Sequence, residues 1–207
     1  MTMREQKQTK FSALKADLVR FAKSKRGVAA IEFAFIAPIL LSLYFVTMEV
    51  AQAIEANKKV GRAASMIADL ITQQQTVNKA DVDAIMKIGK SVLQPYSRSE
   101  PEFIVTGIQI TDEDTPKALV SWSRKISNGV TSRGETPGDE TEIPTKLMIR
   151  NSFLVRVETE LNYKPIITYS PQQKKTLGLT AAFDNINMSE RYHLRPRQSS
   201  TIPCGDC

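Results

Sequence analysis

The chain has 207 residues, of which 42% are hydrophobic, and it carries a formal net charge of +6. This length fits one moderate soluble core plus an additional segment, because domains typically contain about 100–200 residues. The excess positive charge is confined to residues 1–26, which contain eight Lys or Arg residues and only two Asp or Glu residues. The rest of the chain is balanced, which argues against nucleic-acid binding by the folded part.

Residues 1–27 are predicted to be a basic leader on the cytoplasmic side of a membrane. Within it, apolar residues recur at helical spacing at Phe11, Leu14, Leu18 and Phe21. Two interpretations stay open for this pattern. It predicts either a short amphipathic helix on an anionic inner leaflet or a solvated basic tail with incidental apolar residues.

Residues 28–54 predict a transmembrane helix. No charged side chain occurs from Phe33 to Met48, and the wider apolar stretch would span about 30–40 Å as a helix. Pro38 predicts a kink, which spanning helices tolerate. Because Lys and Arg stay on the cytoplasmic side, the residues after about Ile54 should lie in the periplasm of a bacterium, with the anchor in the inner membrane.

Glu32 is an ionisable residue near the start of this apolar segment. A charged group costs roughly 2.5–3.5 kcal/mol at the centre of a spanning helix and less near its edge, so position alone does not explain the residue. Its register relative to Gly27 is more informative. When Val28 is counted as the first residue, Glu32 is the fifth and Phe33 the sixth, and two basic residues precede the glycine.

This arrangement resembles the processing site of type IV prepilins and pseudopilins. More narrowly, RGVAAIEFAFIAPILL in Arg26 to Leu41 is similar to the N-terminal signature of TadE-like proteins, the minor pseudopilins of tight-adherence (Flp) pilus systems. The resemblance implies cleavage after Gly27 by a membrane-embedded prepilin peptidase. It also implies a role in pilus assembly, with other pilins, pseudopilins and assembly-platform proteins as partners. Beyond about Ile54 only the general layout is similar.

Cleavage after Gly27 would give Glu32 a partner. The new α-amino group of Val28 has a reference pKa of about 7.7–8.0 and is largely cationic at neutral pH. A carboxylate one helical turn along can neutralise it, within the same chain or between neighbouring subunits, in surroundings where an unpaired charge is costly. We therefore expect Val28 and Glu32 to form an assembly contact.

Conventional secretion is the chief alternative. Ala51-Gln52-Ala53 contains an A-x-A pattern that a signal peptidase could read, which would release a soluble protein beginning at Ile54. The long basic region before it, together with Glu32 and Pro38 inside the apolar stretch, disfavours this interpretation. A permanently anchored periplasmic binding protein is the other form of the alternative.

Residues 55–207 are predicted to form the periplasmic α+β domain. Apolar residues continue at a period of 3.6 through residues 55–72, which predicts an amphipathic stem. A second helix should follow, with Asn78 as its N-cap, and end before Pro95. The predicted fold is α+β and pilin-like: a long N-terminal transmembrane helix and stem packed on a small antiparallel sheet.

The sheet is predicted from a change of period to two. Strands are expected over Phe103–Thr111, Lys117–Lys125 and Leu154–Tyr163, and the turn at residues 112–116 should pair the first two as a hairpin. Residues 125–146 form a long polar loop that is either mobile or a binding surface. Trp122 is expected in the core.

No catalytic site, cofactor, metal site or small-molecule substrate is predicted, and the protein is not expected to be an enzyme. His193 is the single histidine, lies in a basic segment and is expected at the surface. The acidic clusters at residues 112–114 and 139–142 lack EF-hand spacing and are expected to be solvated turns.

Cys204 and Cys207 form a C-G-D-C sequence. Two thiols cannot complete a tetrahedral zinc site, which normally takes four ligands. Because export is expected, this Cys-containing tail is predicted to close a small structural disulfide loop.

Overall fold

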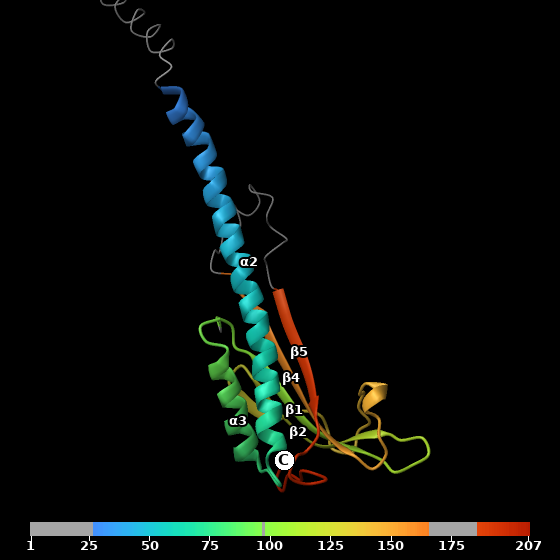
Figure 1. Ribbon diagram of the computed structural model, residues 1–207. Coiled ribbons are helices and arrows are strands. Elements are labelled where there is room, and N and C mark those ends of the chain that lie inside the picture. Colours follow the sequence, from blue (N-terminus) through green and yellow to red (C-terminus); the bar gives the residue numbers. More distant parts are fainter. Residues whose placement is uncertain (1–26, 97, 166–185) are drawn as a thin grey trace, which may run out of the picture. The chain divides into compact units, whose positions relative to one another are not determined.

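The structure is a computed structural model that describes residues 27–96, 98–165 and 186–207 (Figure 1). Both interpretations of the leader fall on residues outside this range. The chain divides into two units, residues 1–48 and 49–207. The described part of the first unit is the beginning of a helix, and the second unit is an α+β domain.

Helix α2 (Val28–Thr72) begins directly after Gly27 and continues through Pro38. It contains a window long and apolar enough to cross a membrane, and none of that window is buried against protein. Ser42 and Thr47 donate to the carbonyl oxygens of Ile39 and Leu43, at 2.8 Å each, so neither hydroxyl is left unpaired in the apolar segment. This helix indicates single-pass membrane anchoring.

The remainder of α2 packs into the domain, which confirms the predicted stem. Its buried residues recur at helical spacing and join one core with α3 and the sheet; they are Ala56, Val60, Ala63, Ala64, Ile67, Ala68 and Ile71. Helix α3 (Lys79–Val92) has Asn78 as its N-cap, as predicted, and Asp81 completes a capping box. Gly89 lets the two helices approach closely, because a Cβ there would lie 2.4 Å from Ile67 Cδ1.

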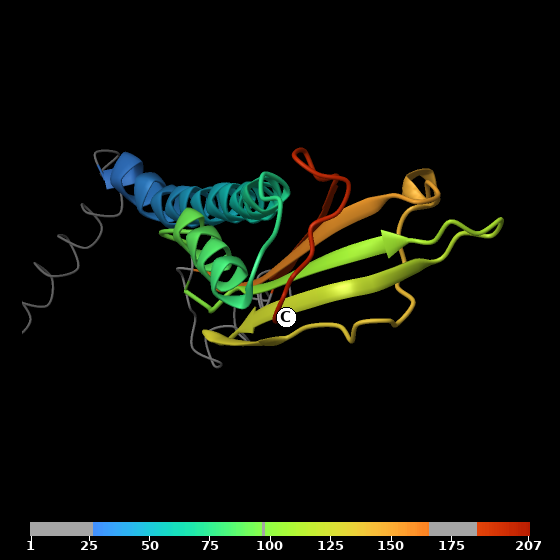
Figure 2. The same cartoon turned by 90° about the horizontal axis from the view of Figure 1, so that it is seen from below.

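In the described residues, five antiparallel strands form one sheet in the order β3-β2-β1-β4-β5. The strands are β1 (Glu102–Ile110), β2 (Ala118–Ser127), β3 (Val130–Arg133), β4 (Phe153–Tyr163) and β5 (Ile186–Leu194). Helix α3 and the domain part of α2 lie on the same face of the sheet (Figure 2). The α+β class and the β1–β2 hairpin are confirmed, and Trp122 is buried, with 2% of its surface exposed.

Two strands were not predicted. The expected polar loop at 125–146 contains the end of β2 and the whole of β3, and its later residues run along β2, where Gly138 N donates to Val120 O and Thr141 N to Ala118 O. Strand β5 includes His193, which is partly buried rather than at the surface. Both strands lie at edges of the sheet and pair with a neighbouring strand on one side only. Such strands can form without a regular alternation of apolar and polar residues, so the sequence did not indicate them.

Candidate functional site

The residues predicted to be read by a prepilin peptidase lie at the start of α2. Val28 and Phe33 are 48% and 68% exposed, and Glu32 is exposed as well. Val28 and Glu32 are four positions apart in one helix and therefore lie on the same side of it. Among the described residues, a Cβ built at Gly27 would meet no atom within 4 Å, so the packing of this part of the chain does not require a glycine there.

A second feature lies where the domain begins. Glu49 of α2 is only 5% exposed, and Tyr163 at the end of β4 donates its hydroxyl proton to Glu49 Oε1 at 2.7 Å. Burial, followed by the hydrogen bond and negative charge of Glu49, raises the pKa of Tyr163 to about 12. The sequence prediction placed Glu49 within the 28–54 span and missed this contact. The available signal was that Glu49 is the first ionisable residue after the charge-free stretch.

The loop after α3 is tied to the same end of β4. Arg98 Nη1 donates to the carbonyl oxygen of Lys164 at 2.8 Å, and the Ser99 hydroxyl donates to the carbonyl oxygen of Asn162. The side chains of Arg98 and Lys164 are both exposed. These bonds place two basic residues beside Tyr163.

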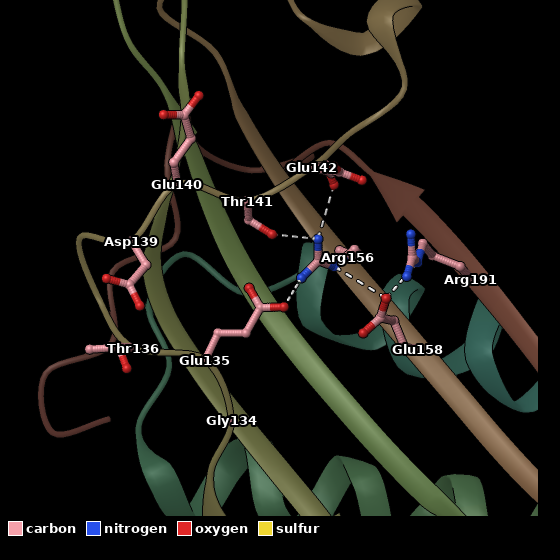
Figure 3. Close-up of a pocket in the computed structure, with 10 residues that line it drawn as sticks. All are labelled: Gly134, Glu135, Thr136, Asp139, Glu140, Thr141, Glu142, Arg156, Glu158 and Arg191. Carbon is pink, nitrogen blue, oxygen red and sulfur yellow. Dashed lines mark hydrogen bonds and ion pairs between the residues drawn. The ribbon is translucent and has the colours of Figure 1, made fainter.

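A polar pocket of about 490 Å³ opens on the sheet face away from the helices (Figure 3). Arg156 lies at its base with 3% of its side chain exposed. Its Nη1 donates to Thr141 Oγ1 at 2.8 Å and to the carbonyl oxygen of Glu142 at 3.1 Å, while Nη2 pairs with Glu135. The guanidinium of Arg156 therefore fixes residues 134–142 against the sheet.

Ion pairs continue across this pocket toward β5. Glu158 Oε1 lies 3.7 Å from Arg156 Nε and 2.5 Å from Arg191 Nε. His193 is paired opposite Arg156 in the sheet register. Burial, with the charges of Arg156 and Arg191, lowers the pKa of His193, and Glu158 opposes this shift. These ion pairs and hydrogen bonds hold the covering loop, residues 134–142, against the sheet, so the pocket is lined by residues that stabilise the fold.

The two cysteines form a disulfide between residues 204 and 207. Their sulfurs lie near a carboxylate oxygen of Asp206, but sulfurs joined in a disulfide are not available as thiolate metal ligands. Asp206 instead accepts a hydrogen bond from the backbone N–H of Lys79 at 2.7 Å, at the start of α3. The disulfide loop thus supplies a second carboxylate to the N-terminus of that helix.

These observations define a class: a single-span, membrane-anchored α+β protein with an exposed segment at the start of its apolar helix. Residues 27–69 match the family model of TadE-like proteins. The match covers α2 nearly to its end and confirms the resemblance inferred from Arg26 to Leu41. It indicates involvement in a tight-adherence pilus system. No curated protein and no solved structure matches the chain.

Proposed function

We propose that this protein is a minor pseudopilin that takes part in the assembly of tight-adherence (Flp) pili and is processed after Gly27 by a prepilin peptidase. The observation that carries the proposal is a coincidence at one position. The family match begins at Gly27, and helix α2 begins at the next residue, Val28. Among the described residues, no packing contact accounts for a glycine at position 27, whereas recognition by a prepilin peptidase would.

The proposed topology places the leader in the cytoplasm and residues 55–207 in the periplasm, anchored by α2 in the inner membrane. Its partners are then the prepilin peptidase, other pilins or pseudopilins and the assembly-platform proteins. The protein acts by contact, as a substrate and subunit, and not as an enzyme. After cleavage, the amine of Val28 and the carboxylate of Glu32 would form the charge pair that selects the correct neighbour.

Conventional secretion with cleavage after Ala53 fits the structure less well. That cut falls inside α2, between Glu49 and Ala56, both of which are buried in the domain. Release at Ile54 would remove Glu49 from Tyr163 and expose a hydroxyl that is now buried. Cleavage after Gly27 leaves intact the contacts that the described residues of the domain make with one another.

The experiment that tests processing is the N-terminus and intact mass of the protein from host membranes, with and without the prepilin peptidase. We expect a chain that begins at Val28 only when the peptidase is present. Gly27→Leu should block processing without affecting the fold, because a Cβ there would meet no atom of the described residues within 4 Å. A chain that begins at Ile54, or one that stays uncut in both hosts, would overturn the proposal.

A second variant separates processing from assembly. Glu32→Gln should be cleaved normally but should enter the assembly complex poorly, because the Val28 amine then lacks its carboxylate. Glu55→Gln, an exposed change farther along α2, is the matched control and should assemble normally. Piliation of the Glu32→Gln strain at the control level would remove the charge-pair role.

A further inference from the structure

The domain begins where the charge-free span ends. Residues 28–48 form about 30 Å of helix, which is the thickness of a bilayer's hydrocarbon core. Glu49 follows directly and is already buried against Tyr163. No spacer therefore separates the apolar segment from the first residue that packs into the domain, whatever angle the helix takes in the membrane.

The end of the domain around Glu49 has a distinct surface. Tyr163 ends β4, Lys164 follows it, and Arg98 is held to Lys164 through the backbone carbonyl. The cationic side chains of Arg98 and Lys164 are exposed, whereas the carboxylate of Glu49 is buried. The carboxylate of Glu49 is thus withdrawn from the surface, and two cationic side chains are exposed beside it. The exposed carboxylate of Glu100, two residues after Arg98, is paired with Lys90.

We propose that this end of the domain, formed by Glu49, Arg98, Tyr163 and Lys164 and here called the membrane-facing end, rests on the bilayer and that Arg98 and Lys164 contact phospholipid phosphate groups. Guanidinium and ammonium groups bind phosphate oxygens through charge-assisted hydrogen bonds, and basic residues beside a membrane span are attracted to anionic headgroups. The membrane boundary of α2 then falls at Met48 rather than at Ile54.

The neighbouring part of α2 fits this placement. Val50 and Ile54, one helical turn apart, are 40% and 52% exposed on the side that the domain does not cover. Apolar side chains at this level gain partial burial at the boundary between the headgroups and the acyl chains. The inference depends on where the domain starts and not on cleavage after Gly27, so it stands or falls separately from the proposed function.

The test uses the full chain in lipid nanodiscs that contain phosphatidylcholine and phosphatidylglycerol, with a spin label on the lipid headgroup as quencher. A fluorophore is attached to Asn162→Cys, an exposed position one residue before Tyr163, while Cys204 and Cys207 stay in their disulfide. The control site is Glu113→Cys, in the exposed turn at the opposite end of β1. We expect strong quenching at 162 and little at 113. Equal, weak quenching at both sites would overturn the membrane contact.

The phosphate contact is tested by Arg98→Gln with Lys164→Gln. Each lost charge should reduce the ratio of membrane-contacting to detached domains roughly fivefold in phosphatidylglycerol discs, and high salt should act similarly. Lys117→Gln with Arg150→Gln is the control pair, since both residues flank the opposite end of the sheet. Unchanged Trp122 fluorescence would show that the fold is intact. If quenching at position 162 changes neither in the Arg98→Gln, Lys164→Gln variant nor at high salt, the proposed role of Arg98 and Lys164 is overturned.

Discussion

A largely buried ion pair joins helix α3 to the sheet, and its removal should lower the stability of the domain substantially. Arg124 on β2 donates from Nε and Nη2 to Asp83 Oδ1 at 3.1 and 3.0 Å, and from Nη2 to Oδ2 at 2.8 Å. The two side chains are 9% and 17% exposed. Asp83→Ala would leave the Arg124 charge buried without its carboxylate.

The expected loss of unfolding free energy for Asp83→Ala is about 3–5 kcal/mol, which is the usual effect of breaking a buried pair from one side. The total unfolding free energy of a domain is only about 5–15 kcal/mol, so this loss should be easily measured. Asp83→Leu with Arg124→Met should recover most of the loss, since an apolar pair of similar volume avoids the uncompensated charge.

The assay is urea unfolding of the full protein in detergent micelles, followed by fluorescence. Trp122 is the single tryptophan of the chain and is buried in the domain, so the signal reports on that unit alone. Asp112→Ala is the control, because its pair with Arg150 is exposed on both sides and should be worth less than about 1 kcal/mol. The reasoning is refuted if Asp83→Ala costs no more than the control, or if the double variant is as unstable as the single one.

Three further predictions concern the domain. Gly107→Ala should destabilise it by about 3 kcal/mol in urea unfolding, because a Cβ would lie 2.6 Å from the Trp122 ring and 2.8 Å from Phe153 Cζ; Gly205→Ala, with open space around it, is the control and should be near neutral. The lowered pKa of His193 means that the unfolded state binds more protons below about pH 6.5. The wild type should therefore lose stability faster than His193→Gln as the pH falls from about 7.5 to 5, and parallel curves would contradict the shift. Cys204→Ser should cost about 2 kcal/mol, as expected for a short loop, and reductant should lower the wild type to the level of the variant without affecting the variant further.

Elements with strong internal patterns were predictable from the sequence. Apolar residues recur every 3.6 positions up to the end of α2 at Thr72 and so predict that helix. Asn78 predicts the start of α3, because its side chain accepts a hydrogen bond from the backbone of Asp81, three residues later. Strands β1, β2 and β4 alternate clearly enough to be located within two residues of their bounds. Each of these signals is local: it depends only on the residues of the helix or strand that it predicts.

Features that depend on distant segments were not predictable. Arg156 carries a charge and lies in the predicted strand Leu154–Tyr163, yet its side chain is buried because residues 134–142 cover that face of the sheet. Glu49 accepts a hydrogen bond from Tyr163, which is 114 residues away in sequence. Strand β5 depends on its pairing with β4, and its own residues give little sign of it. In each case the deciding partner is brought close only by the tertiary fold.

The contacts of residues 202–206 set a limit on when the domain can fold. Ile202 is fully buried and accepts the Trp122 indole proton at 2.7 Å, Val77 N donates to Pro203 O at 3.0 Å, and Asp206 binds the start of α3. Every described helix and strand of the domain precedes this segment in the chain. The core of the domain is therefore incomplete until residues 202–206 have joined it, and chains truncated before residue 202 should be open to proteolysis.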